Sequence, residues 1–306
     1  MNKKIISILI PVFNESKNIN IIYSRISKIV KKENKYDFEI LFTNNCSTDD
    51  TQKKIKKLIS KDKKVRIITL SKNFGRNISL FAGLKNVRGD IIFLIDADGE
   101  DPPEMLSNFL RKYEQGYELV YGIRNRIRES FFLYLGAKIF YRFTNLFADN
   151  EIILDMGEFV LFTKEINQEI IKIKTDKPFI RSELSAVGFK KFGIKYLRSK
   201  RKFGKTKFGI FNLLAYAMTG FLSASTFFLR FNAASGTFLL VVNIIFGYLF
   251  MQNKINLDFL IFVNTVYLLL ISIFTSIYLA RTHNNILSRS VYVIDKKQSF
   301  NNSKLI

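Results

Sequence analysis

Short apolar runs alternate with longer segments of helical spacing throughout the first half of the chain. Runs rich in Ile, Val, Leu and Phe predict buried strands, which lie at residues 4–13, 38–43, 65–70 and 90–96. Segments in which apolar residues recur every three or four positions predict the intervening helices, at residues 15–32, 47–59 and 77–87. Such alternation indicates an α/β fold with a parallel sheet that is covered on both faces.

Polar loops follow the predicted strands at their carboxyl ends. Their sequences are PVFNE, TNNCSTDD, SKNFGRN and DADGEDPPE, which begin at Pro11, Thr43, Ser71 and Asp96. In open α/β sheets, ligands bind beyond the carboxyl ends of the strands. We therefore expect the four loops to line one crevice.

The last third of the chain has long apolar stretches instead. No charged residue lies between Arg230 and Lys254, or between Asp258 and Arg281. Each stretch is long enough for a membrane-spanning helix, which needs about 20 apolar residues. Basic residues flank both outer ends and the link is nearly neutral, so both outer ends are expected to face the cytoplasm. A further uncharged stretch, Gly209–Leu229, carries several polar residues and is predicted to lie on or partly in the membrane.

Smaller features add detail to this picture. The aromatic segment Phe131–Phe147 has two interpretations, a core helix or an interfacial helix at a membrane surface. The N-terminus is interpreted as a strand and not a signal peptide, because its apolar run has no small-residue cleavage site and continues into Pro11. The single cysteine, Cys46, excludes an intramolecular disulfide and is expected to be a small buried residue. His283 is expected to lie in the headgroup region.

The formal net charge of +22 requires an anionic partner or surface. Nucleic acid and a membrane are the two candidates, and the apolar stretches favour the membrane. Nucleic-acid binding is the weaker alternative, because no recognised nucleic-acid motif accompanies the basic residues. The pattern as a whole predicts a cytoplasmic domain at residues 1–208, interfacial helices at 209–230, two membrane helices at 231–281 and a basic cytoplasmic tail at 282–306.

Five acidic side chains lie within the segment DADGEDPPE of this basic chain. In an extended segment, side chains two residues apart point the same way, so Asp96, Asp98 and Glu100 can converge on one point. Such hard oxygen ligands suit Mg²⁺ or Mn²⁺. The structural alternative is a helix start at DPPE, which accounts for Asp101 and Glu104 but not for the first two carboxylates.

Five motifs occur in a specific order along the chain: SILIPVFNESKNI, NNCSTDDT, SKNFGRNISLFAGLKNVRGD, DADGEDPPE and RKFGKTKF, followed by the two apolar stretches. In this order they resemble a family 2 glycosyltransferase. Within that family the chain is similar to the polyprenyl-phosphate glycosyltransferases, the dolichol-phosphate mannose synthase group. The resemblance implies a GT-A fold and transfer of a sugar from a UDP- or GDP-linked donor to a polyprenyl phosphate, with undecaprenyl phosphate as the expected acceptor.

The resemblance also implies roles for particular residues. Those implied to hold the nucleotide are Pro11, Phe13, Glu15, Asn44, Asn45 and Asp96. Those implied to hold Mg²⁺ or Mn²⁺ on the diphosphate are Asp96, Asp98 and Glu100. Those implied to be catalytic, or to lie near the acceptor, are Asp98, Asp155 and Glu158. Those implied to hold the lipid phosphate are Arg124 and Arg201.

The chain departs from the family pattern at several of these places. Asn44 and Asn45 stand where the family usually has two Asp, which removes charge from the nucleoside pocket and puts the donor preference in doubt. Glu100 stands where Gln is usual, and Glu158 is one methylene longer than the usual Asp. Phe228 lies where the family tends to have Pro before its membrane helices.

Two other functions remain as alternatives. A processive polysaccharide synthase shares the nucleotide-binding half, but such enzymes carry a Gln-x-x-Arg-Trp motif and this chain has no Trp. A non-catalytic membrane scaffold with a degenerate transferase domain is slightly favoured by the two Asn residues and opposed by the intact carboxylates. The family resemblance places the protein in the inner membrane with its catalytic domain in the cytoplasm, and a homo-oligomer is compatible with it.

Overall fold

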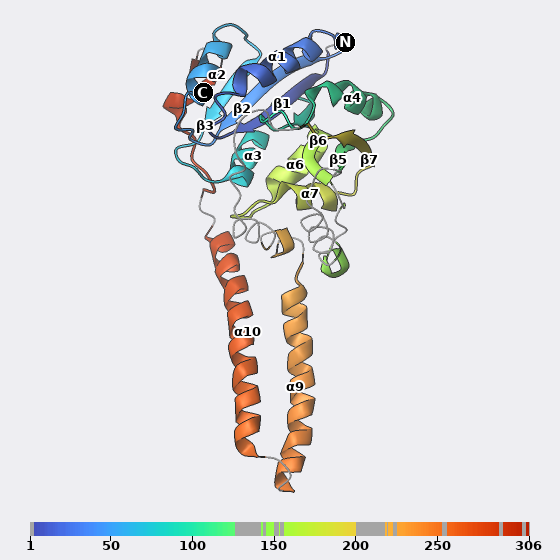
Figure 1. The fold of residues 1–306 in the computed structure, drawn as a ribbon, viewed down its shortest axis with the longest axis vertical. Coiled ribbons are helices and arrows are strands. Elements are labelled where there is room, and N and C mark those ends of the chain that lie inside the picture. Colours follow the sequence, from blue (N-terminus) through green and yellow to red (C-terminus); the bar gives the residue numbers. More distant parts are fainter. Residues whose placement is uncertain are drawn as a thin grey trace.

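The computed structural model describes residues 3–125, 142, 145–149, 153, 156–199, 218, 220–222, 225–252, 256–287, 290–301 and 304–305. They form an α/β domain from which two long helices extend, and the C-terminal residues return to the domain (Figure 1). Most of the aromatic segment Phe131–Phe147 and most of Gly209–Leu229 lie outside the described residues.

Four parallel strands form the centre of the sheet. They are β1 (Ile5–Val12), β2 (Asp37–Asn44), β3 (Val65–Thr69) and β4 (Ile91–Leu94). β1 lies between β2 and β4, and β3 pairs with the other side of β2. Nearly every position of these strands is buried, as expected for a parallel sheet covered on both faces. The strands that the hydrophobic pattern predicts are confirmed.

Beyond β4 the sheet becomes mixed. β6 (Met156–Thr163) pairs antiparallel with β4 and with β5 (Leu119–Asn125), and β7 (Lys191–Leu197) pairs parallel with β5. The strand–helix alternation predicts only the parallel strands. β6 extends the sheet in the opposite direction, and this brings its first residues to the carboxyl edge of β4.

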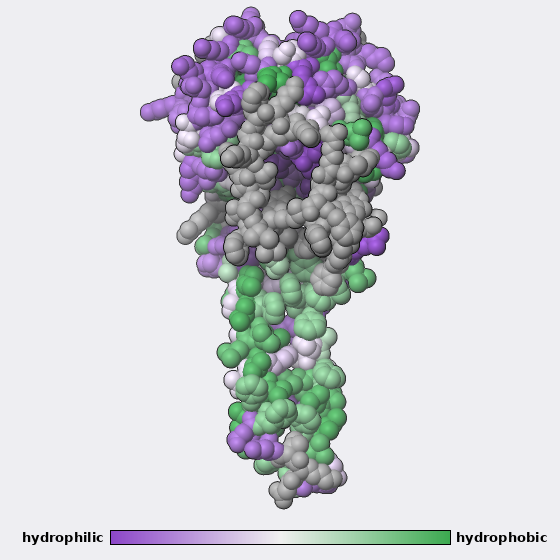
Figure 2. Space-filling model, viewed as in Figure 1, coloured by the Kyte–Doolittle hydropathy of each residue, from purple (hydrophilic) through white to green (hydrophobic). Residues whose placement is uncertain are grey.

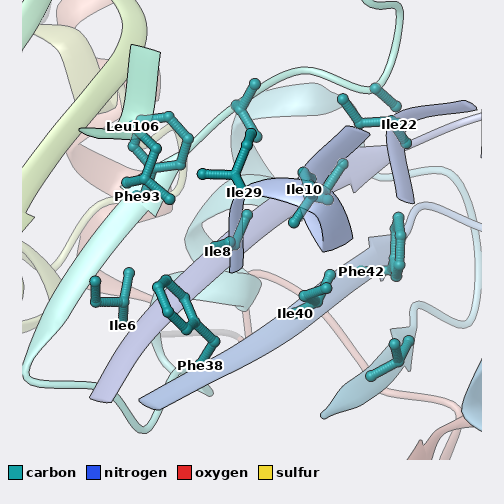
Figure 3. Packing of buried hydrophobic residues seen from close by; sticks show 14 of the residues in the cluster. Ile6, Ile8, Ile10, Ile22, Ile29, Phe38, Ile40, Phe42, Phe93 and Leu106 are labelled. Atoms are coloured by element: carbon teal, nitrogen blue, oxygen red, sulfur yellow. The ribbon is translucent and has the colours of Figure 1, made fainter. Parts of the chain in front are cut away.

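Helices cover both faces of the sheet and create two apolar cores. One face carries α1 (Ile19–Val30), α2 (Thr51–Ile59), the 3-10 turn η1 (Pro103–Met105) and α4 (Leu106–Glu114). The other face carries α3 (Arg76–Leu84), α6 (Lys164–Lys172) and α7 (Ile180–Ala186). In the first core, Ile22 and Ile29 of α1 pack in one cluster with Ile8 and Ile10 of β1 (Figure 3). Leu9 between them belongs to the second core, because successive strand residues point to opposite faces.

The absence of a side chain at Gly83 lets α3 approach the sheet closely. A Cβ atom there would lie 2.4 Å from Cδ1 of Leu9 and 2.6 Å from Oγ1 of Thr43. At its other end α3 begins at Arg76, directly after Gly75, whose φ of 91° is one that glycine adopts readily. Since β3 ends at Thr69, the first turn of the helix follows the carboxyl end of that strand.

In the described part of the chain, two helices are long and apolar enough to cross a membrane. They are α9 (Phe227–Met251) and α10 (Leu257–Ile286), and neither has a buried residue. Their apolar side chains form a band below the polar domain (Figure 2). Polar residues connect the two helices. The side-chain amides of Asn243 on α9 and Asn264 on α10 exchange hydrogen bonds of 2.8 and 2.9 Å. The two predicted apolar stretches are thus confirmed as long helices.

The chain returns to the domain after α10. We call the described residues 290–301 and 304–305 the C-terminal tail. It contains η2 (Lys296–Gln298), β8 (Phe300–Asn301) and β9 (Lys304–Leu305). β8 pairs antiparallel with β3, so the described strands form one sheet in the order β7-β5-β6-β4-β1-β2-β3-β8-β9. The start of α9 and the end of α10 therefore lie on the same side, next to the domain (Figure 1).

Candidate active site

The carboxyl edge of the parallel strands meets the start of β6. Leu94, the last residue of β4, pairs with Val160 of β6. Because the two strands run antiparallel, Asp96 just beyond Leu94 comes to lie opposite Glu158, which precedes Val160. Glu158 is only 5% exposed. Strand pairing therefore brings a buried carboxylate to the acidic loop from a distant part of the sequence.

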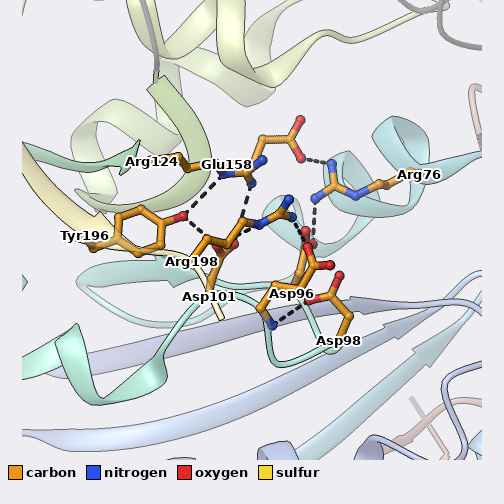
Figure 4. Close-up of polar contacts among 9 residues, drawn as sticks. Arg76, Asp96, Asp98, Asp101, Arg124, Glu158, Tyr196 and Arg198 are labelled. Carbon is orange, nitrogen blue, oxygen red and sulfur yellow. Dashed lines mark hydrogen bonds and ion pairs between the residues drawn. The ribbon is translucent and has the colours of Figure 1, made fainter. Parts of the chain in front are cut away.

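Arg76 joins these two carboxylates. Its Nη2 lies 2.6 Å from Oδ1 of Asp96, and its Nη1 contacts the carboxylate of Glu158 (Figure 4). Burial alone would raise the pKa of Asp96, but the charge and hydrogen bond of Arg76 outweigh it, with further help from Arg124 and Arg198. The pKa of Asp96 therefore lies below its ordinary value, and the carboxylate stays ionised at neutral pH.

The rest of the acidic loop is held by other partners. Gly99 has a φ of 75°, so the chain turns there as expected. Oδ1 of Asp98 accepts a hydrogen bond of 3.0 Å from the backbone N–H of Glu100, whose own carboxylate pairs with Arg198. In the described residues, no three His, Cys, Asp or Glu side chains form a group that could hold a metal. The metal role of Asp96, Asp98 and Glu100 stays a prediction.

Asp101 is the centre of a second, buried cluster. It is 1% exposed and accepts a hydrogen bond from the Tyr196 hydroxyl, while Nη2 of Arg124 lies 3.6 Å from its Oδ2. Burial raises the pKa of Asp101 above its ordinary value, although Arg124 pulls in the opposite direction. The helix-start interpretation is therefore wrong for this residue: η1 has no side-chain cap, and Asp101 instead joins the acidic loop to β5 and β7. Glu104 does lie in the first turn, where it pairs with Arg25 at 2.6 Å.

The amides of Asn44 and Asn45 hold neighbouring loops together. Asn44 is fully buried at the end of β2, where its Nδ2 donates to Oε1 of Gln52 at 3.0 Å. Asn45 donates to Oδ1 of Asn73 at 2.7 Å and accepts from the backbone N–H of Phe74 at 2.9 Å. Both side chains thus use donor groups that an Asp could not supply.

The other predicted nucleotide residues lie in the loop after β1. Pro11 is buried in β1 beside Thr43 of β2, and Phe13 is half-buried. The backbone N–H of Glu15 donates to Oγ1 of Thr51 at 2.8 Å, which ties this loop to the start of α2. Cys46 is half-buried and not buried as expected; it lies in the loop after Asn45, with a φ of 59°. The structure therefore brings the first two loops together, as the sequence predicts.

Two predicted residues, Asp155 and Arg201, lie outside the described residues, and four contributors to the site were not predicted. These are Arg76, Asp101, Tyr196 and Arg198. Arg76 lies in SKNFGRN, one of the loops expected at the crevice. Its location near the site could therefore be predicted, but its pairing with Asp96 could not. No local pattern identifies Tyr196, because it reaches Asp101 only through the pairing of β7 with β5.

Comparison with known protein families identifies the family to which the chain belongs. A sequence model described as "Glycosyl transferase family 2" matches residues 7–171, which include the acidic loop, Arg76 and Glu158. The chain belongs to glycosyl transferase family 2. The transferase therefore has the expected GT-A type of α/β fold, and it is an enzyme that transfers a sugar.

Several curated proteins are similar to the transferase over most of its length. The uncharacterized glycosyltransferase YkcC of Bacillus subtilis is 29% identical over 98% of this chain and 96% of its own. The prophage bactoprenol glucosyl transferase homolog of Escherichia coli is 32% identical over 85% of this chain and 84% of its own. Among solved structures, mannosyl-3-phosphoglycerate synthase from Rubrobacter xylanophilus has a TM-score of 0.49 at 16% identity, over 72% of this chain and 73% of its own.

Proposed function

We propose that the transferase moves a sugar from a UDP- or GDP-linked donor to the phosphate of a polyprenyl lipid, at the cytoplasmic face of the bacterial inner membrane. One observation carries the proposal: the same chain joins a carboxylate and arginine site at the sheet edge to two helices whose apolar side chains are exposed. The similarity to the Escherichia coli protein named as a prophage bactoprenol glucosyl transferase homolog supports the lipid acceptor.

Asp96, Asp98 and Glu100 are the residues that would hold a divalent metal. Their donor atoms are carboxylate oxygens, which Mg²⁺ and Mn²⁺ prefer. Asp96 is ionised beside Arg76, as a carboxylate that binds a metal must be. The donor set therefore fits such a metal in its chemistry. When bound, the metal supplies positive charge that offsets the charge developing on the leaving diphosphate.

The acceptor phosphate is already an anion, so it needs positioning more than it needs a general base. Arg124 is suited to this task because 21% of its side chain is exposed. A guanidinium can also form two parallel hydrogen bonds with phosphate oxygens. We assign the same task to Arg201, in the basic segment that follows β7. Glu158 and Asp155 are assigned to the acceptor side of the reacting sugar.

The path of the chain supports one orientation in the membrane. α9 and α10 form a hairpin, and the tail after α10 pairs with β3 of the catalytic sheet. A third crossing would place the tail and the sheet on opposite sides of the membrane, where they could not pair. Together with the basic residues beside both outer helix ends, this supports two crossings with the domain and the tail in the cytoplasm.

The full chain, purified and placed in lipid nanodiscs, tests the proposal. Undecaprenyl phosphate is offered with a panel of radiolabelled UDP- and GDP-sugars, and lipid-linked product is extracted and counted. We expect product with one sugar nucleotide, its loss with EDTA, and its return with Mg²⁺ or Mn²⁺.

Two results would contradict parts of the proposal separately. A preparation that binds nucleotide but labels no polyprenyl phosphate refutes the acceptor, and transfer that persists in EDTA refutes the metal. Glu169→Gln is the control for variants of the acidic loop and should retain full transfer. Its carboxylate lies on α6, is 53% exposed and is far from the acidic loop in sequence.

A further inference from the structure

The C-terminal tail is built into the catalytic sheet. An isolated bridge joins Leu70 to Ile294, and the backbone N–H of Ser71 donates to the carbonyl of Val293 at 2.9 Å. Without the tail, β3 would be the edge of the sheet with its backbone groups unpaired. The loop that follows β3, which contains Asn73 and leads into α3, therefore starts from a strand that the tail holds in place.

Ser299 anchors the tail to β3. It is completely buried, its Oγ accepts a hydrogen bond of 3.0 Å from the backbone N–H of Thr69, and the same hydroxyl donates to the carbonyl of Asp295 at 2.8 Å. Oδ1 of Asp295 in turn accepts from the backbone N–H of Lys297 at 3.0 Å. These bonds fold the tail into a compact turn and fix the direction of the Gln298 carbonyl.

A chain of hydrogen bonds runs from this carbonyl to the end of β2. The backbone carbonyl oxygen of Gln298 accepts hydrogen bonds from Nε2 of Gln52 at 3.1 Å and from Oγ1 of Thr69 at 3.2 Å. Oε1 of Gln52 then accepts from Nδ2 of Asn44 at 3.0 Å. Oδ1 of Asn44 accepts from the backbone N–H of Ser47 at 3.0 Å, so Asn44 shapes the loop in which it lies.

The donor-to-acceptor direction of this series of hydrogen bonds is fixed at the end that lies in the C-terminal tail. A backbone carbonyl can only accept, so Gln52 must turn its NH₂ group toward Gln298 and its oxygen toward Asn44. Asn44 must then donate. The Asp that the family usually has at this position would set a carboxylate against the oxygen of Gln52, which places two acceptors face to face.

We propose that the C-terminal tail is a positioning element of the donor site, acting through the relay Gln298–Gln52–Asn44, and that Asn44 is the residue that adapts this site to the tail. The inference rests on the proposed function, and on the role in the nucleoside site that the family resemblance implies for Asn44. It explains a departure from the family pattern by a contact that lies more than half the chain away in sequence.

Binding of UDP and GDP to the full chain in nanodiscs, measured by calorimetry with Mn²⁺ present, is the first test. Gln52→Leu breaks the relay without changing Asn44, and we expect the preferred nucleotide to bind about 3- to 10-fold more weakly, the range for one or two lost hydrogen bonds. Lys53→Met changes the exposed neighbour on α2 and should stay within about twofold of the wild type. Wild-type affinity in Gln52→Leu overturns the inference.

A double-mutant cycle separates the tail from direct contacts of Asn44 with nucleotide. Asn44→Asp is measured in the full chain and in a chain that ends at Ser290. In the shortened chain Gln52 is free to turn round and donate, so the penalty of Asn44→Asp should fall at least about threefold. An equal penalty in both chains refutes the relay, and if the shortened chain does not fold, Gln52→Leu decides alone. A wild type that binds neither nucleotide refutes the proposed function itself.

Discussion

A buried ion pair holds the amino ends of the central strands, at the edge of the sheet opposite the site. Nη1 of Arg66 on β3 lies 2.6 Å from Oε2 of Glu39 on β2, and their side chains are only 6% and 10% exposed. Glu39 also accepts hydrogen bonds from the backbone N–H of Arg88, at 2.6 Å, and from the hydroxyl of Ser7. One carboxylate therefore satisfies three donors from different parts of the chain.

Glu39→Ala should strongly destabilise the domain. It leaves the guanidinium of Arg66 buried without a counter-charge, and it removes the acceptor of Arg88 and Ser7. Breaking a buried ion pair on one side typically costs about 3–5 kcal/mol. In a domain of this size each kcal/mol lowers the midpoint of thermal unfolding by about 2–4 °C. The expected fall in the midpoint is therefore about 6–20 °C.

Circular dichroism is the suitable assay, because the chain has no Trp for fluorescence. The near-ultraviolet tyrosine signal reports packing of the domain during heating of the full chain. Lys35→Ala is the matched control: it removes an ion pair of similar length, 3.1 Å to Glu114, but with the lysine side chain 74% exposed. Exposed pairs contribute below about 1 kcal/mol, so its midpoint should hardly change. A Glu39→Ala midpoint equal to that of Lys35→Ala would refute the reasoning.

Three further predictions concern the site and the membrane. Asp98→Ala should lower transfer about a hundredfold or more by weakening metal binding, with an unchanged thermal midpoint; wild-type transfer rates would contradict this. Arg76→Gln removes the guanidinium that joins Asp96 to β6 and should lower transfer about 10- to 100-fold, the range for a lost charged hydrogen bond. Its control, Arg111→Gln on the surface of α4, should be neutral in the same radiolabel assay. A reporter fused after Ile306 should be active only in the cytoplasm, and activity on the far side would indicate a third crossing.

Local sequence patterns were sufficient for much of the fold. The strands β1 to β4 are short segments rich in Ile, Leu, Val and Phe, and the helices between them repeat apolar residues at helical spacing, so each could be recognised within its own segment. The polar loops at the carboxyl ends followed from the parallel sheet. The two long apolar helices followed from the absence of charge over a membrane-spanning length.

The site could be predicted only in part, because its pairing is not local. The acidic loop was recognisable from Asp96 and Asp98, but the cations that hold it were not. Arg76 reaches Asp96 from another loop, and Glu158 joins them only because β6 runs antiparallel to β4 with Leu94 opposite Val160. The register of one strand against another depends on residues far apart in sequence, which no single periodicity contains.

The meaning of Asn44 shows the same division most clearly. By itself the sequence determined that an amide stands where the family usually has a carboxylate. Only the tertiary structure decided what the amide does, because its partner Gln52 is oriented by the carbonyl of Gln298 at the other end of the chain. A side-chain amide can donate or accept, and its choice is made by the nearest group that can do only one of the two. Here that group is the backbone carbonyl of Gln298, which follows both long helices in the sequence and which only the tertiary fold places beside the sheet.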